Sequence, residues 1–169
     1  MADPRPLILT GTLDEPTQSW LDGLRARHFP AERNYLSAHL TLFHALPGAD
    51  ADAVTGDVRA AVDRAPMSAT VTGPRLLGRG VAFVVDCPEL LELRRELAAR
   101  WSARLTRQDA GKSDLHVTVQ NKVSPDAARA LHDDLAAGFE PSGTTVTGLA
   151  LWRYAGGPWD PGPVAPFSG

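Results

Sequence analysis

Apolar and polar residues along the chain recur with two periods, which predict short β-strands and amphipathic helices in turn. Asp14 is placed to cap the first predicted helix, and Pro30 ends it. In the first half we predict a strand at 6–12, a helix at 14–28, a polar link at 31–34, a strand at 35–44, a helix at 51–64 and a strand at 67–77. In the second half we predict a strand at 81–86, a helix at 88–105, a polar link at 106–114, a strand at 115–119, a helix at 124–137 and a strand at 144–154. The order is strand, helix, link, strand, helix, strand, and it occurs twice.

This repeated order predicts an internal duplication with an offset of about 77 residues, which places His39 on His116. The tetrapeptide Thr70-Val-Thr-Gly also recurs, starting at Thr145. We therefore expect a single domain over 1–169 with two related lobes, about 1–78 and 79–155, packed around a pseudo-twofold axis. The Pro- and Gly-rich tail, 156–169, shows neither period, and we expect an irregular strap packed on the body, with a disordered end as the alternative.

The motif His-x-Thr occurs once in each half, in segments that read as strands. Because side chains alternate between the faces of a strand, His39 and Thr41 share one face, as do His116 and Thr118. Apolar residues occupy the alternate positions of both copies, so the opposite face of each strand belongs to a core. If the two strands are neighbours, they present two imidazoles and two hydroxyls to one groove.

Composition narrows the classes of function. Apolar residues make up 43% and charged residues 22%, as in ordinary globular proteins, and the net charge of −3 disfavours a broad basic surface for nucleic acid. Cys87, the only cysteine, excludes an intramolecular disulfide and reads as a buried structural thiol. The first residues lack a long apolar run, so we expect a cytoplasmic protein with no membrane contact.

The paired motifs suit acid–base chemistry on a phosphate. Imidazole titrates near neutrality, so one neutral histidine can remove a proton while a protonated one delivers a proton to a leaving oxygen. Threonine hydroxyls can donate hydrogen bonds to phosphate oxygens as charge develops. No cluster has metal-ligand spacing, and neither a nucleophile elbow nor a dinucleotide-binding glycine motif is present, so we expect no metal and no cofactor.

Other residues receive structural interpretations. Gln120 and Lys122 continue the face of Thr118 and are interpreted as a solvated strand end, with contact to a phosphate or base as the alternative. Tyr35 is interpreted as a core residue, with base stacking as the alternative. The stretch 75–80 reads as a hairpin turn. Structural or solvated roles are also assigned to three histidines, namely His28, His44 and His132.

His39-Leu-Thr-Leu and His116-Val-Thr-Val, in a duplicated unit of this length, resemble the signature of the 2H phosphoesterase superfamily, closest to its 2′-5′ RNA ligase-like and RNA 2′,3′-cyclic phosphodiesterase branch. The resemblance covers nearly the whole chain. It implies an α+β bilobal fold, in which two antiparallel sheets line a central cleft and helices lie outside. It also implies a site formed by His39, Thr41, His116 and Thr118, with His116 as base and His39 as acid.

The function expected from this resemblance is metal-independent hydrolysis of a 2′,3′-cyclic phosphate or a related cyclic nucleotide phosphodiester. A 2′,5′-phosphodiesterase, a 2′-5′ RNA ligase and a non-catalytic nucleotide or RNA-end binding module are the alternatives. We expect the partner to be a small nucleotide or an RNA-terminal cyclic phosphate, bound by a monomer without a large nucleic-acid interface.

Overall fold

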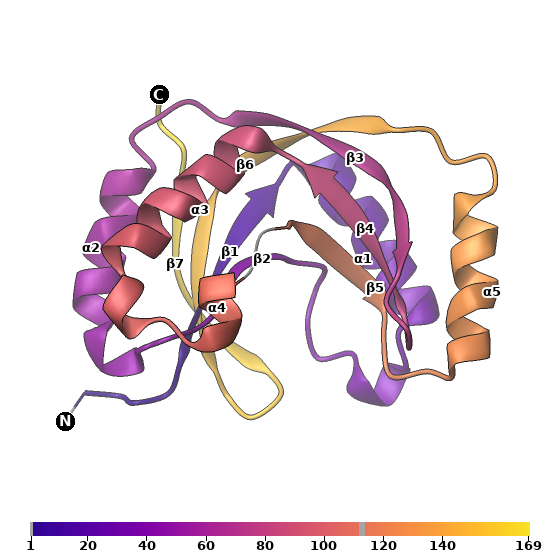
Figure 1. The fold of residues 1–169 in the computed structure, drawn as a ribbon, viewed down its shortest axis with the longest axis horizontal. Helices are drawn as coiled ribbons and strands as arrows, with labels where there is room; N and C mark the ends of the chain where they lie inside the picture. The colour runs from indigo at the N-terminus through magenta and orange to yellow at the C-terminus, as the bar shows by residue number, and fades with distance from the viewer. Residues whose placement is uncertain (1, 112–113) are drawn as a thin grey trace.

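The structure, a computed structural model, describes residues 2–111 and 114–169 and has the predicted α+β composition (Figure 1). The first half contains β1 (Leu7–Leu13), α1 (Glu15–His28), β2 (Leu40–Leu46), α2 (Ala51–Ala61) and β3 (Met67–Leu76). The second half contains β4 (Val81–Asp86), α3 (Pro88–Arg100), α4 (Arg107–Gly111), β5 (His116–Gln120), α5 (Pro125–Ala136), β6 (Ser142–Tyr154) and β7 (Trp159–Pro166).

The strands of the described residues form one antiparallel sheet that closes on itself. Its order is β1-β2-β5-β4-β3-β6-β7, and a further pairing of β1 with β6 completes a ring of the first six strands. Exchanging β1, β2 and β3 for β4, β5 and β6 reproduces the same ring, so the strand order has the symmetry that a duplicated unit would produce. The duplication itself stays a prediction.

The expectation of two separate sheets is wrong in its connectivity. The β2 and β5 strands are joined by the pair Leu40–Val117, and this single pair makes the two groups of strands continuous. By contrast, five residue pairs join β3 to β6 on the opposite side of the ring, and seven pairs join β1 to β6. The seam between β2 and β5 is therefore the weakest backbone connection in the ring.

Local sequence signals explain where the helices begin. The Asp14 carboxylate accepts a hydrogen bond from the Thr17 amide at 3.0 Å, and the Ser124 hydroxyl accepts one from the Ala127 amide at 3.1 Å. Both caps satisfy amides that a helix start leaves without a partner, as the sequence predicted. A proline follows within the first turn in each case, where its missing N–H costs nothing.

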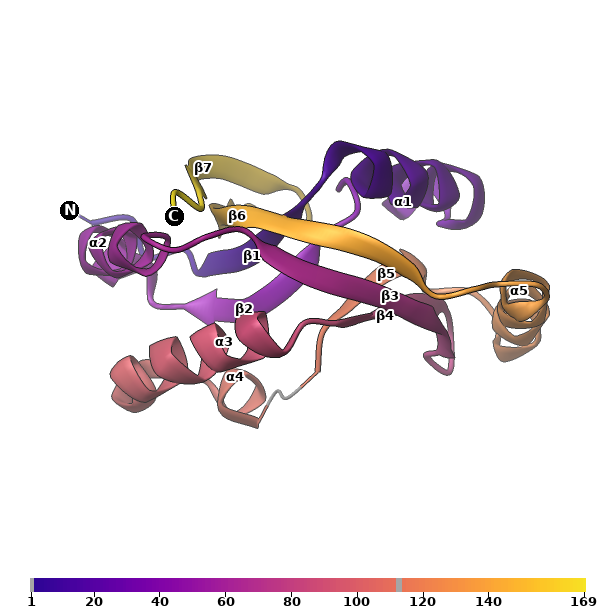
Figure 2. The same cartoon turned by 90° about the horizontal axis from the view of Figure 1, so that it is seen from above.

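The helices gather at two ends of the sheet, α2, α3 and α4 at one and α1 and α5 at the other (Figures 1 and 2). At the α1 end, Trp20 packs edge-on against Phe83 of β4 with ring centroids 4.8 Å apart. At the α3 end, Trp101 packs against Phe43 of β2 at 5.2 Å and is 2% exposed. Leu40 and Leu42 of β2 and Val117 and Val119 of β5 are fully buried, so the apolar face of each motif strand lies in a core; Cys87 is also fully buried.

Two segments differ from their predictions. Residues 159–166 form a strand, not an irregular strap, and β7 pairs with β6 from Gly148–Pro166 to Tyr154–Trp159. Prolines are tolerated there because β7 lies at the sheet edge, where a missing N–H removes no second ladder bond. The polar link also contains the short helix α4, whose five residues are too few to show a helical period in the sequence. Residues 112–113 of that link lie outside the described residues.

No helix within 2–111 and 114–169 is both long and apolar enough to cross a membrane.

Candidate active site

The two His-x-Thr motifs meet at the seam between β2 and β5. Leu40 is the cross-strand partner of Val117, so in antiparallel register His39 lies opposite Thr118 and Thr41 lies opposite His116. Leu40 and Val117 are fully buried, whereas His39, His116 and Thr118, on the other face of the strands, are partly exposed. His39 and His116 are therefore diagonal neighbours, a relationship that places strand residues about 7–8 Å apart. The register therefore places two imidazoles and two hydroxyls on one face of the two strands.

His39 lies just before the first residue of β2, and its ring contacts the Ser37 carbonyl and the Trp159 ring. Its Nδ1 lies 2.8 Å from the Ser37 carbonyl oxygen, which can only accept, so Nδ1 carries the proton and Nε2 the lone pair. Burial lowers the pKa of His39 to about 4; the bond to Ser37 opposes this shift, and the charges of Arg25, His44 and His116 add to it. The imidazole is therefore neutral at pH 7.

His116 has a different polar environment. Its Nδ1 lies 3.2 Å from Asp114 Oδ2 and 3.1 Å from Arg75 Nη2, and Arg75 Nη1 in turn lies 2.7 Å from Asp114 Oδ2. Nδ1 can thus accept from the guanidinium when it is unprotonated and donate to the carboxylate when it is protonated. Partial burial opposes ionisation of Asp114, but Arg75 and His116 outweigh it and lower the Asp114 pKa. Each protonation state of His116 has a partner.

Two buried arginines, which the sequence analysis did not single out, fix the motif strands. Arg25 of α1 donates to Asn34 and Leu36 in the link before His39, and to the Thr118 carbonyl at 3.0 Å. Arg94 of α3 donates to the Leu42 carbonyl at 2.9 Å and to the Asp109 carbonyl.

Each of these arginines is 4% exposed and lies over a phenylalanine ring, Arg25 over Phe29 and Arg94 over Phe43. Arg25 therefore connects the link before the first motif to the strand of the second motif. Arg94 connects the link before the second motif to the strand of the first motif. A signal was available in the sequence, since both arginines fall on the apolar stripes of their helices.

An aromatic cavity adjoins His39. The Trp159 ring lies 4.5 Å from the His39 ring and 6.0 Å from the Trp152 ring, centroid to centroid. The cavity has a volume of about 360 Å³, and its lining includes these three residues, Tyr35, Gln18 and Asp22. Trp159 begins β7, so the segment expected to be an irregular strap instead brings an aromatic ring to the site.

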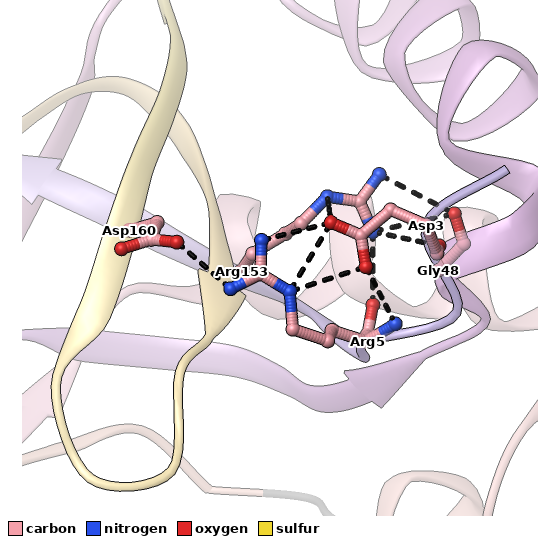
Figure 3. Close-up of polar contacts among 5 residues, drawn as sticks. All are labelled: Asp3, Arg5, Gly48, Arg153 and Asp160. Atoms are coloured by element: carbon pink, nitrogen blue, oxygen red, sulfur yellow. Dashed lines mark hydrogen bonds and ion pairs between the residues drawn. The ribbon is translucent and has the colours of Figure 1, made fainter.

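An ion-pair network holds the hairpin of β6 and β7 against the N-terminal segment (Figure 3). Arg5 donates to Asp160 at 2.9 Å and to Asp3 at 2.8 Å, and Arg153 donates to the backbone carbonyls of Asp3 and Arg5 at 3.1 and 2.9 Å. Hydrogen bonds from Arg5 lower the Asp3 pKa to about 2. Because Asp160 follows Trp159 directly, the network anchors the backbone beside His39.

The remaining predicted residues divide between correct and incorrect interpretations. Tyr35 is 60% exposed, so its interpretation as a core residue is wrong, and Gln120 is 7% exposed, so its interpretation as solvated is wrong. Lys122 is exposed, as predicted, and residues 77–80 form the hairpin turn between β3 and β4, although Arg75 beside that turn reaches the site.

The other histidines lie outside the pair of motifs. His44 contacts the buried carboxylate of Asp109 at 3.2 Å, His28 ends α1, and His132 lies on α5 beside Asp133. In the described part of the chain, no group of three or more His, Cys, Asp or Glu side chains is placed to hold a metal ion.

The fold and the paired motifs define the class of two-histidine phosphoesterases, as the resemblance predicted. The sequence matches the family described as the 2′-5′ RNA ligase superfamily over residues 13–158, and the chain belongs to this family. A comparison with curated proteins found no match.

Solved structures with the same fold extend over almost the whole chain. TT0787 of Thermus thermophilus has a TM-score of 0.65 at 17% identity, with 97% of this chain and 98% of that chain covered. E. coli LigT complexed with 3′-AMP has a TM-score of 0.63 at 20% identity, with 99% and 100% covered. A structure described as a phosphoesterase has a TM-score of 0.57 at 21% identity, with 99% and 100% covered. At these identities the likeness establishes the fold.

Proposed function

We propose that this protein is a metal-independent phosphodiesterase that opens a 2′,3′-cyclic phosphate, or a related cyclic nucleotide phosphodiester, to a phosphomonoester. The observation that carries the proposal is the pairing of Leu40 with Val117, which sets both His-x-Thr motifs on one face of neighbouring strands. Two imidazoles on opposite sides of one phosphate can serve an attacking water and a leaving oxygen together.

The reaction needs one proton acceptor and one proton donor. Water attacks phosphorus and gives a proton to the base, the bond from phosphorus to one ribose oxygen breaks, and the acid protonates that oxygen. Thr41 and Thr118 donate hydrogen bonds to the non-bridging oxygens, whose charge increases as water adds. The guanidinium of Arg75, 3.1 Å from His116, adds positive charge on the same side.

His39 is the base in this proposal and His116 the acid, the reverse of the assignment expected from the resemblance. His39 is neutral at pH 7, and the Ser37 carbonyl fixes the tautomer in which Nε2 accepts a proton. His116 lies beside the Asp114 carboxylate, which stabilises an imidazolium. The neutral His39 can accept a proton, and the Asp114 carboxylate can accept a hydrogen bond from a protonated His116, so the two rings can take the opposite roles that a concerted transfer requires.

The proposed partner is a small nucleotide or the cyclic phosphate at an RNA end, bound by a monomer. E. coli LigT, which has the same fold, was crystallised with 3′-AMP, and a nucleoside monophosphate is the size of product expected here. The net charge of −3 gives little attraction to a long nucleic acid.

The test is hydrolysis of nucleoside 2′,3′-cyclic phosphates in excess EDTA, with products separated by chromatography. We expect one phosphomonoester from the wild-type protein and a rate of its formation that is roughly 10²–10⁴ lower in His39→Ala or His116→Ala. Saturable binding without product would identify a binding module, and a joined product from RNA ends would identify a ligase. Loss of activity on chelation, restored by a divalent ion, would contradict the metal-independent mechanism.

A further inference from the structure

The pairing of β1 with β2 contains two register shifts just after the first motif. At one of them, Thr41 and Phe43 of β2 pair with neighbouring residues of β1, Thr10 and Leu9. Neighbouring residues of a strand face opposite ways, and cross-strand partners face the same way, so Phe43 lies on the face opposite to Thr41. The alternation that the sequence shows from His39 onward therefore reverses at this point.

The reversal brings His44 to the face that carries the motif side chains. At the other register shift, Ile8 of β1 lies opposite two residues of β2, the first of which is His44. Ile8 shares its face with Thr10, the partner of Thr41, so this β-bulge turns His44 toward the face of Thr41. Burial agrees with this arrangement, because the side chain of His44 is 36% exposed whereas Phe43 is fully buried.

The carboxylate of Asp109 orients the His44 ring. Asp109 comes from α4, is fully buried, and accepts hydrogen bonds from the backbone amides of His44 at 2.8 Å and Ala45 at 2.9 Å. Burial opposes ionisation of Asp109, but the hydrogen bonds from His44 and Ala45 outweigh it and lower the Asp109 pKa. Asp109 Oδ1 also lies 3.2 Å from His44 Nδ1. An ionised carboxylate can only accept, so Nδ1 carries a proton and the ring is held at that nitrogen.

The second ring nitrogen of His44, Nε2, is left for a ligand. No hydrogen bond reaches it from any part of the chain that the structure describes. A strand rises about 3.3 Å per residue, so three positions set Thr41 and His44 at most about 10 Å apart along β2. Burial is the main cause of the lowered His39 pKa, and the charges of His44 and His116 add to it. His44 therefore lies within electrostatic reach of the first motif.

We propose that His44 is a third imidazole of the site and donates a hydrogen bond from Nε2 to a phosphate oxygen of the substrate and of the product. The inference rests on the proposed function, because it takes the phosphate to lie between the two motifs. With the Asp109 carboxylate at Nδ1 and an anionic oxygen at Nε2, a protonated ring has an acceptor at each nitrogen. A cyclic diester carries a single negative charge, whereas a phosphomonoester carries about −1.5 to −2 at pH 7. His44 should therefore hold the product more strongly than the substrate.

The first experiment compares the binding of adenosine 2′-monophosphate with that of adenosine, which lacks the phosphate, by calorimetry. A hydrogen bond to a charged group contributes about 1.5–3 kcal/mol, so His44→Phe should lower the preference for the nucleotide roughly 10- to 150-fold. His44→Gln keeps an N–H group near the position of Nε2 and should retain most of that preference. An unchanged preference in His44→Phe, or an equal loss of affinity for both ligands, would overturn the proposal.

His132→Phe is the matched control for this comparison. The His132 ring also contacts an aspartate, Asp133, at 3.2 Å, and its side chain is 30% exposed, close to the value for His44. It lies on α5, away from the motif strands, so its replacement should leave the preference for the nucleotide unchanged. An equal effect of His132→Phe and His44→Phe would contradict a specific contact at His44.

The second experiment measures turnover of adenosine 2′,3′-cyclic phosphate. A contact made equally with the substrate and the transition state changes KM, so His44→Phe should raise KM while kcat falls by less than about tenfold. Inhibition by the phosphomonoester product should weaken more than KM rises, because the product carries the larger charge. A loss of kcat as large as that in His39→Ala, with KM and product inhibition unchanged, would place His44 in proton transfer and contradict the phosphate contact.

Binding and turnover together keep this inference separable from the proposed function. A preference for the nucleotide that His44→Phe weakens, in a protein that hydrolyses no cyclic phosphate, would support the contact at His44 and contradict the proposed enzyme. Hydrolysis by the wild-type protein, with an unchanged preference in His44→Phe, would contradict the contact at His44 and leave the enzyme standing.

Discussion

Arg25 and Thr118 are joined by a hydrogen bond of 3.0 Å, from guanidinium Nη1 to carbonyl oxygen, across 93 positions of sequence. The bond ties helix α1 of the first half to the second motif strand. Arg94 makes the reciprocal connection from α3 to the carbonyl of Leu42 at 2.9 Å. Because one backbone pair joins β2 to β5, these two side chains determine much of the alignment between the motifs.

Arg25→Met should lower both stability and turnover. Methionine fills much of the space of arginine but removes the hydrogen bonds to the carbonyls of Leu36 and Thr118, and a buried acceptor that loses its donor costs about 1–3 kcal/mol. Urea unfolding measures the loss. Arg27→Met is the matched control, since Arg27 is exposed on the same helix. Equal stability of the two variants would show that Arg25 is not an anchor.

His39→Ala and His116→Ala should each reduce turnover by roughly 10²–10⁴ while the protein stays folded. If acid and base act in one concerted transfer, the double variant should be little worse than the more damaged single variant. Single-turnover hydrolysis measures the rates, with circular dichroism as the folding control. Folded variants that work at the wild-type rate would refute the catalytic role of the motifs.

Activity on a nitrophenyl phosphodiester should distinguish the catalytic roles of His39 and His116. Nitrophenolate leaves without protonation, so His116→Ala should lose far less activity on this ester than on the cyclic phosphate, whereas His39→Ala should lose activity on both. The wild-type kcat/KM should also rise as the pH increases through about 4, where the base loses its proton. Rescue of the His39 variant alone would restore the assignment expected from the resemblance.

His39 should make the protein less stable in mild acid. Its pKa is about 4 in the folded state against a reference value of 6.5, so between these values the unfolded chain binds more protons and stability falls as the pH decreases. His39→Gln, which cannot be protonated, should flatten this part of the pH dependence. Urea midpoints at pH 4.5 and pH 7 provide the comparison. An identical slope in wild type and variant would mean that His39 is protonated freely in the folded state.

Arg5→Ala should loosen the β6–β7 hairpin without unfolding the protein. Arg5 and its partners are exposed, so the global unfolding midpoint should hardly change. Hydrogen exchange should accelerate at residues 154–160, beside the site. Arg95→Ala, which removes an exposed pair within α3, is the control. No local change in exchange would show that the network in Figure 3 does not restrain the hairpin.

Much of the fold was predictable, because alternation and capping are local signals. Asp14 and Ser124 marked helix starts, and the parity of His39 with Thr41 marked their common face. The strand at 159–166 was not predictable from its prolines, because only the neighbouring strand reveals that this segment lies at an edge. Likewise Arg75 and Trp159 reach the motifs through the register of neighbouring strands, which local periodicity does not reveal.

The single pair between β2 and β5 also has a consequence for motion. Elsewhere the ring is held by ladders of several pairs, so separation at this seam breaks fewer backbone bonds than at any other joint between the described strands of the ring. A small opening there would widen the space between the histidines and leave every helix intact. Transient separation of β2 from β5 would let the phosphomonoester leave the site after each turnover.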